Sequence, residues 1–449
     1  MINLDKPEND LRLTRVKVDR LFDVFNHDIA LDGDTGITII IGENGLGKTV
    51  ILEAIKAFFD RKHVFFEDLS FDKFEFYFNN KEVWSLTKER KEDGVILYVS
   101  RDGPGKTSGK PQKIAKIGSI RKNAKSRRSW EVATRMDVHE YEYLMSKASK
   151  SEDMLSELRH LNNVRYFISE EDNKIIPPVW YVEGTSKINV KLIETQRILT
   201  AKDGGDSFVM TIQRCAENLT TDISEVMKRS ADVTSSLDSS YPNRLIEKFR
   251  RGTKGTYSEL NVALSKLDER RKSLAATGLV VDNKDYDLAK IDESQKDLIV
   301  LLKLYIDDSH EKLDPYDNLA QKIRLLMDIV NKRFKHKKIE INKDNGFQFR
   351  STTNVNADGK YVVIPSTRLS SGEQHELVLF YKLIFESRSG DMILIDEPEL
   401  SLHISWQNKF IKDLKQVASM NDVTVVIATH SPDIIDENWD LKVQLRGVE

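Results

Sequence analysis

One glycine-rich segment has the residue types needed to hold the phosphates of a nucleotide. It fits the pattern G-x-x-x-x-G-K-[ST] in full, with Gly42, Glu43, Asn44, Gly45, Leu46, Gly47, Lys48 and Thr49. Glycines let backbone N–H groups turn inward around phosphate oxygens, the Lys48 ammonium adds charge for the β and γ phosphates, and the Thr49 hydroxyl can ligate Mg²⁺. Because a β-branched segment at 37–41 precedes the loop and a helix-like segment at 50–59 follows, we predict a phosphate site here rather than a chance match.

Two adjacent acids follow a second apolar run, residues 392–395. This run predicts a buried strand that brings Asp396 and Glu397 to its C-terminal end, where α/β sheets bind ligands. Asp396 would then hold Mg²⁺ through water, and Glu397 would polarise an attacking water as general base. Many strands end in an acidic turn, so the pair is informative only because a phosphate loop accompanies it.

A serine-rich helix start lies 26 positions before Asp396. Its hydroxyl groups and free helical N–H groups predict a second anion site, formed by Ser370, Ser371, Gly372 and Gln374. An ordinary helix start is the alternative, since Ser370 and Glu373 also fit a capping box.

A histidine lies 34 positions after Asp396, at the end of the apolar segment 423–428. A neutral His430 imidazole at that sheet edge can touch a γ-phosphate or orient a water molecule. The alternative is a surface histidine without a role.

The elements that must position these residues are predicted from hydrophobic periodicity. Strands are expected within 11–41, 64–100, 190–193, 338–341, 347–349 and 361–364, and helices at 137–165, 207–335, 372–386 and 404–419. Residues 103–128 carry nine Lys or Arg and no Asp or Glu, which predicts a mobile basic loop.

Composition limits the classes of protein that the chain could be. It has 449 residues, 39% hydrophobic and 31% charged, which is typical of a globular protein. The single cysteine, Cys215, excludes an internal disulfide. A polar N-terminus and short apolar runs predict a cytoplasmic protein with no membrane span. Since the net charge is −3, any nucleic-acid binding must come from a local patch.

In their order along the chain, the four motifs resemble the ATPase head of ABC-type proteins. Ser370 to Gln374 is similar to the family's signature motif, with Ser371 where a glycine is common, and residues 398–403 resemble the D-loop of the SMC, RecF and OLD-like branch. The resemblance implies an α/β fold, a mixed sheet with flanking helices and an antiparallel β-lobe, and it implies ATP and Mg²⁺ as cofactors. It also implies at least a homodimer with composite ATP sites, and it places Gln196 at the Q-loop, against the alternative of an ordinary loop glutamine.

The spacing of the motifs narrows the resemblance within that branch. Lys48 and Ser370 are 322 positions apart, which leaves room for a helical insertion but not for a long SMC arm. Since only 19 residues follow His430, we expect no Toprim nuclease domain after it. These features resemble the PtuA family, the ATPase subunits of Septu anti-phage defence systems.

This resemblance implies an antiviral ATPase that acts with a separate nuclease subunit, an HNH-type protein of the PtuB kind, which degrades DNA. We expect no nuclease site in this chain. The alternatives are a stand-alone RecF- or SMC-like DNA-binding ATPase in repair, and a nucleotide-dependent scaffold, against which the presence of Glu397 and His430 argues.

The expected domain division follows from the same pattern. Residues 1–206 and 336–449 are predicted to form the ATPase head, and residues 207–335 the helical insertion. Five basic residues are predicted to contact DNA phosphates or an acidic partner: Arg121, Lys122, Lys125, Arg127 and Arg128. The alternative is that they belong to a solvated loop without a binding role.

Overall fold

The computed structural model describes residues 11–31, 33, 35–91, 94–104, 109–118, 175–194, 206–251, 256–280, 296–400 and 402–447. The chain divides into two compact units. The first comprises Met1–Thr195, Arg388–Leu400 and Gln407–Glu449, and the second Gln196–Ser387 and Ser401–Trp406. Residues 336–387 therefore group with the helical segment, whereas the division predicted from the sequence assigns them to the ATPase head. The division into a head domain and an insertion domain stays a prediction.

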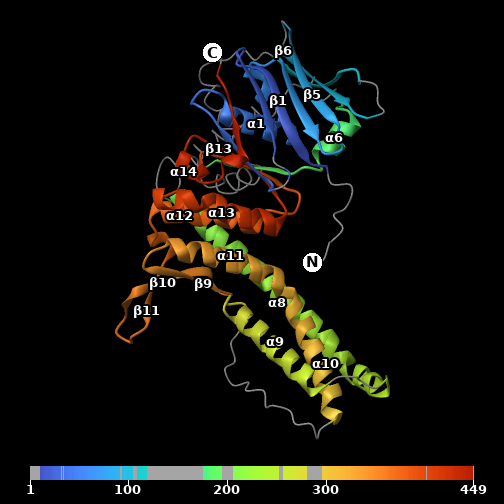
Figure 1. Cartoon of the computed structure of the whole chain (residues 1–449), viewed down its shortest axis with the longest axis vertical. Helices are drawn as coiled ribbons and strands as arrows, with labels where there is room; N and C mark the ends of the chain where they lie inside the picture. Colours follow the sequence, from blue (N-terminus) through green and yellow to red (C-terminus); the bar gives the residue numbers. More distant parts are fainter. Residues whose placement is uncertain are drawn as a thin grey trace, which may run out of the picture. The chain divides into compact units, whose positions relative to one another are not determined.

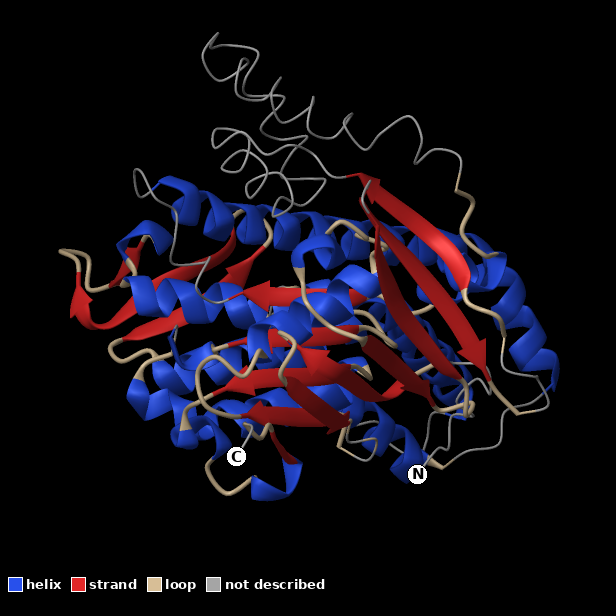
Figure 2. Cartoon of the chain, turned by 90° about the horizontal axis from the view of Figure 1, so that it is seen from above, coloured by secondary structure: helices blue, strands red, loops and turns tan. Residues whose placement is uncertain are grey.

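A five-stranded sheet forms the centre of the first unit, and its described strands all run parallel, whereas the resemblance implies a mixed sheet. Its order is β14-β3-β13-β12-β8, with bounds Lys442–Gln444, Ile37–Ile41, Thr424–Thr429, Met392–Asp396 and Val190–Glu194. The central strands are buried almost throughout, which explains why their sequences are nearly continuous apolar runs. Since neighbouring strands run parallel, β3, β12 and β13 end at the same edge of the sheet. Figure 2 shows the strands of the chain in red and its helices in blue.

An antiparallel six-stranded sheet completes the first unit and confirms the predicted β-lobe. Its order is β2-β1-β4-β5-β6-β7, with bounds Phe25–Ala30, Leu13–Leu21, Lys73–Phe78, Val83–Lys91, Gly94–Asp102 and Gln112–Gly118. Phe74, Phe76 and Phe78 alternate inward along β4. Helix α1, Lys48–Phe59, packs between this core and the parallel sheet, because Phe58 stacks on Phe76 with ring centroids 4.0 Å apart. The phosphate-loop helix is thus fixed by both sheets of its unit.

One prediction about the basic segment is wrong. Residues 112–118 are not loop but strand β7, paired antiparallel with β6, so that Lys113 and Lys116 lie on a sheet edge. Ile114 is buried and its neighbours Lys113 and Ala115 are only partly buried, as on a half-buried strand, and the density of lysines obscured this strand. The five basic residues at 121–128 and the helix expected at 137–165 lie outside the described residues.

Helices dominate the second unit, as predicted. They are α8 (Asp206–Arg251), α9 (Tyr257–Ala275), α10 (Lys296–Leu313), α11 (Asp317–Arg333) and α12 (Ser371–Tyr381), which continues as a π-helical turn at Lys382–Glu386. Leucines at helical spacing on α9 pack against α10, which lies between α9 and α8 (Figure 1). A three-stranded antiparallel sheet in the order β11-β10-β9 (Tyr361–Ile364, Gly346–Val355, Lys337–Asn342) packs beside α8 and α11.

The remaining elements are short helices and one longer one. They are α2 (Phe65–Asp68), α6 (Val179–Thr185), η2 (Asp314–Tyr316), η3 (Ser366–Arg368), η5 (Pro398–Leu400), α13 (Ile404–Asn421), α14 (Pro432–Ile435) and η6 (Trp439–Leu441). No helix in the described part of the chain is both long enough and apolar enough to cross a bilayer.

Candidate active site

The phosphate loop leaves β3 and enters α1 through two glycines with left-handed backbone. Gly45 has φ +90° and Gly47 has φ +88°, conformations that L side chains rarely adopt. Gly47 also lies against strand β1, because a Cβ there would come within 2.7 Å of Leu21 Cδ2. The loop is further held by His27 of β2, whose Nε2 lies 2.9 Å from the Leu46 carbonyl oxygen. Burial lowers the pKa of this histidine.

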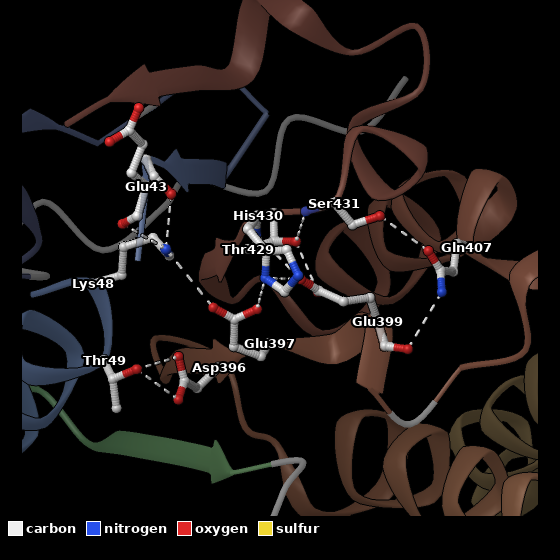
Figure 3. A network of polar contacts seen from close by, with 11 residues as sticks. Glu43, Lys48, Thr49, Asp396, Glu397, Glu399, Gln407, Thr429, His430 and Ser431 are labelled. Atoms are coloured by element: carbon white, nitrogen blue, oxygen red, sulfur yellow. Dashed lines mark hydrogen bonds and ion pairs between the residues drawn. The ribbon is translucent and has the colours of Figure 1, made fainter. Parts of the chain in front are cut away.

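Lys48 points back over its own loop. Its ammonium donates to the carbonyl oxygens of Gly42 at 2.8 Å and Glu43 at 3.2 Å, and only 5% of the residue is exposed. A Glu397 carboxylate oxygen lies 3.9 Å from Nζ (Figure 3). A buried ammonium held by two carbonyl oxygens beside a carboxylate has the charge to bind phosphate oxygens, and that role of Lys48 stays a prediction.

Thr49 and Asp396 meet at the edge of the parallel sheet. The Thr49 hydroxyl lies 3.0 Å from both oxygens of the Asp396 carboxylate, although 347 positions separate them. Burial raises the pKa of Asp396, while the Thr49 hydrogen bond opposes that shift. A hydroxyl and a carboxylate beside a phosphate loop are the hard oxygen ligands that Mg²⁺ prefers, so the pair fits this ion.

Glu397 and His430 form the centre of the site. His430 Nδ1 lies 2.5 Å from a Glu397 carboxylate oxygen, and each residue directly follows its strand, β12 or β13 (Figure 3). Glu397 adopts φ +46°, a costly conformation for a residue with a side chain, and its N–H donates to the Ala428 carbonyl at 2.8 Å. Burial, and then the neighbouring Glu399, raise the pKa of Glu397 to about 7, while His430 opposes the shift. A carboxyl group with such a pKa suits a general base near neutral pH.

A third carboxylate and its partners were missed by sequence reasoning. Glu399, on η5, is 9% exposed and accepts hydrogen bonds from the Thr429 hydroxyl at 2.7 Å and the His430 N–H at 3.1 Å. Gln407 of α13 donates to the Glu399 carbonyl at 3.3 Å and accepts from the Ser431 hydroxyl at 3.0 Å. The only signal in the sequence was an acid two positions after Glu397, in a segment interpreted as a D-loop.

The signature motif lies in the second unit, at the start of α12. Ser370 caps this helix in a capping box with Glu373, so the ordinary helix-start interpretation is correct as local geometry. Glu373 is also held by Lys337 at 2.7 Å, and Gln374 is buried, with its amide donating to the Leu369 carbonyl at 2.9 Å. The Gln374 amide therefore stabilises the loop, while Ser370, Ser371 and Gly372 remain accessible. Their role in binding nucleotide stays a prediction, and Gln196 lies outside the described residues.

A parallel sheet with a phosphate loop and a Thr–Asp pair fit for Mg²⁺ defines the class of P-loop ATPases, and the predicted α/β fold is confirmed. The family model described as "AAA ATPase domain" matches residues 22–435, and the chain belongs to that family.

Two curated relatives share a short segment with the chain. UvrABC system protein A from Clostridium perfringens is 35% identical over 71 residues, and the same protein from Clostridium acetobutylicum is 37% identical over 71 residues. In both cases the match covers 16% of this chain but only 8% of the relative's length.

Solved structures of SMC heads are similar over most of the chain but only loosely. The Smc head domain with an extended coiled coil bound to the C-terminal domain of ScpA, derived from Pyrococcus furiosus, is 11% identical with a TM-score of 0.33, covering 97% of this chain and 94% of that one. The SmcHead bound to the C-winged helix domain of ScpA gives the same identity and TM-score, covering 94% and 90%. At these values the likeness has no bearing on function.

Proposed function

We propose that the chain hydrolyses ATP with Mg²⁺ at a site completed by a second copy, and that it is the cytoplasmic ATPase subunit of an anti-phage defence complex. In that complex a separate HNH-type nuclease subunit degrades DNA. The observation that carries the ATPase reaction is the convergence of Lys48, the Thr49–Asp396 pair and the Glu397–His430 pair within one unit. The defence role is supported by the resemblance of the motif order and spacing to the PtuA family.

Each of these residues has a step in the proposed reaction. Lys48 holds the β and γ phosphates and offsets their charge, and Thr49 and Asp396 hold Mg²⁺. When bound, Mg²⁺ neutralises charge that develops on the phosphate oxygens. Glu397 takes the proton of the attacking water, and His430 orients that water or the γ-phosphate.

The second copy is needed because an ABC-type signature completes the site of another chain. Ser370 of one chain would then face Lys48 of its partner. Neither Lys48→Ala nor Ser370→Arg should hydrolyse ATP alone, since each homodimer has two damaged sites. Mixed in equal amounts, they form heterodimers with one intact site, and measured phosphate release should recover to about a quarter of the parent rate if pairing is random. A lack of recovery, with mixed dimers shown by pull-down, would contradict the composite site.

The defence assignment is tested by what binds the chain in its native host. Tagged chain should co-purify with a small HNH-type protein, and the pair should degrade DNA. If no nuclease is recovered and the chain alone binds DNA ends or gaps, the stand-alone RecF- or SMC-like repair ATPase replaces the defence proposal, and the ATPase reaction is unaffected.

A further inference from the structure

Glu399 makes several polar contacts at the sheet edge that the proposed reaction does not explain. Its two carboxylate oxygens are engaged separately: Oε2 accepts from the Thr429 hydroxyl, and Oε1 accepts from the His430 backbone N–H. The same Oε1 lies 3.0 Å from His430 Nδ1. One buried carboxylate therefore holds both the backbone and the ring of His430.

The carboxylate is itself held from two further directions. Thr429, its partner, accepts from the Ser431 N–H at 3.0 Å, so the end of β13 is closed into a small ring of hydrogen bonds. Gln407 joins the Glu399 carbonyl to the Ser431 hydroxyl across the start of α14. Such a buried network resists rearrangement, because each broken bond costs the free energy of a buried hydrogen bond.

The His430 ring is anchored on one nitrogen only. Nδ1 lies within 3.0 Å of both Glu397 and Glu399 oxygens, whereas Nε2 has no partner among the described residues, and half of the side chain is exposed. Two carboxylates converging on Nδ1 favour a proton at that nitrogen, since carboxylate oxygens accept.

We propose that Glu399 is a positioning residue for ATP hydrolysis: it fixes the His430 ring with its proton on Nδ1, so that Nε2 is presented toward the γ-phosphate or the attacking water. In this role Glu399 acts through His430 and needs no contact of its own with phosphate or water. This inference rests on the proposed ATPase reaction but concerns a residue outside the four motifs.

Glu399→Gln tests the proposal with little change of shape. The amide oxygen still accepts from the His430 N–H and the amide group can donate to the Thr429 hydroxyl, so the fold is kept, but the second negative partner of Nδ1 is lost. We expect kcat to fall by about tenfold, on the scale seen when a group that orients an acting imidazole is removed, with an unchanged Kd for ATP measured by direct binding. The matched control is Glu82→Gln, an equally buried carboxylate that pairs with Arg101 in the β-lobe and should leave kcat unchanged.

The tautomer of His430 provides a second readout that needs no turnover. In ¹⁵N spectra of histidine-labelled protein, the His430 signals, identified by their loss in His430→Ala, should show the proton on Nδ1. In Glu399→Gln they should shift toward the Nε2-protonated form. Thr429→Val, which leaves Glu399 in place without its hydroxyl anchor, should change kcat in the same direction by less, whereas Thr429→Ser should not.

The outcomes separate this inference from the proposed function. Parent-like kcat and unchanged His430 signals in Glu399→Gln would overturn the positioning role while the ATPase reaction stands. If the parent chain shows no turnover, the proposed reaction fails, and the tautomer measurement still decides whether Glu399 fixes the ring.

Discussion

At the scale of single residues, the site combines charged groups that face the phosphate loop with neighbouring residues that hold them in place. Lys48, Thr49, Asp396, Glu397 and His430 were predicted because their types, order and spacing along the chain suit a phosphate site and little else. Glu399 and Gln407 were missed because an acid in a turn and a glutamine on a helix are common, and only the folded chain shows which carbonyl or imidazole they contact.

The glycines of the phosphate loop allow a prediction that separates backbone strain from packing. Gly45→Ala and Gly47→Ala both place a side chain at φ near +90°, which costs about 1 to 2 kcal/mol. Only Gly47→Ala also brings a Cβ within 2.7 Å of Leu21, where overpacking adds about 1 to 3 kcal/mol. Denaturant unfolding without nucleotide should therefore show Gly47→Ala as clearly the less stable variant. Equal stability of the two would mean that the loop does not pack against β1 as described.

At the scale of elements, most strands and helices were predictable because their apolar patterns are strong. The sequences of the buried parallel strands are nearly continuous runs of apolar residues, and β4 alternates strictly between buried and partly exposed residues. Strand β7 was misassigned because its lysines outweighed its few apolar residues. The grouping of 336–387 with the helices depends on contacts between distant segments that no local pattern reveals.

The signature helix α12 is joined to α11 by a pair of charges that the sequence did not suggest. Arg333 and Glu376 form an ion pair at 2.9 Å, with side chains only 2% and 0% exposed. Because removing one member leaves the other charge buried, Glu376→Leu should lower the free energy of unfolding by about 3 to 5 kcal/mol.

The double variant Arg333→Met with Glu376→Leu is the control for that ion pair. It removes both charges, and it should recover most of the stability lost in Glu376→Leu when both are measured by denaturant unfolding. If the double variant is no more stable than Glu376→Leu, the loss comes from shape rather than from the buried charge that remains.

At the scale of the whole molecule, an acidic chain with one strongly basic segment should bind nucleic acid through that segment or not at all. Replacing Arg121, Lys122, Lys125, Arg127 and Arg128 with Ser removes five charges from a protein of net charge −3. The logarithm of the DNA-binding constant falls linearly with the logarithm of salt concentration. If these side chains contact DNA phosphates, the slope for the variant should be less negative than that for the parent chain by about 4. Basal ATPase should stay intact.

The salt titration has two other informative results. An unchanged slope would exclude this segment as the DNA contact. If the variant keeps its DNA binding but no longer co-purifies with a nuclease subunit, the segment is a docking site for that partner instead.

The central claim is that Glu397 activates water for attack on an ATP that Lys48, Thr49 and Asp396 hold. The most direct measurement compares phosphate release and nucleotide retention for the parent chain, Glu397→Gln and Lys48→Ala, each with Mg²⁺ and ATP. Glu397→Gln should release phosphate at least about 100-fold more slowly, since a general base contributes on that scale, while still retaining ATP through gel filtration. Lys48→Ala should retain none. Phosphate release by Glu397→Gln at the parent rate would contradict the claim.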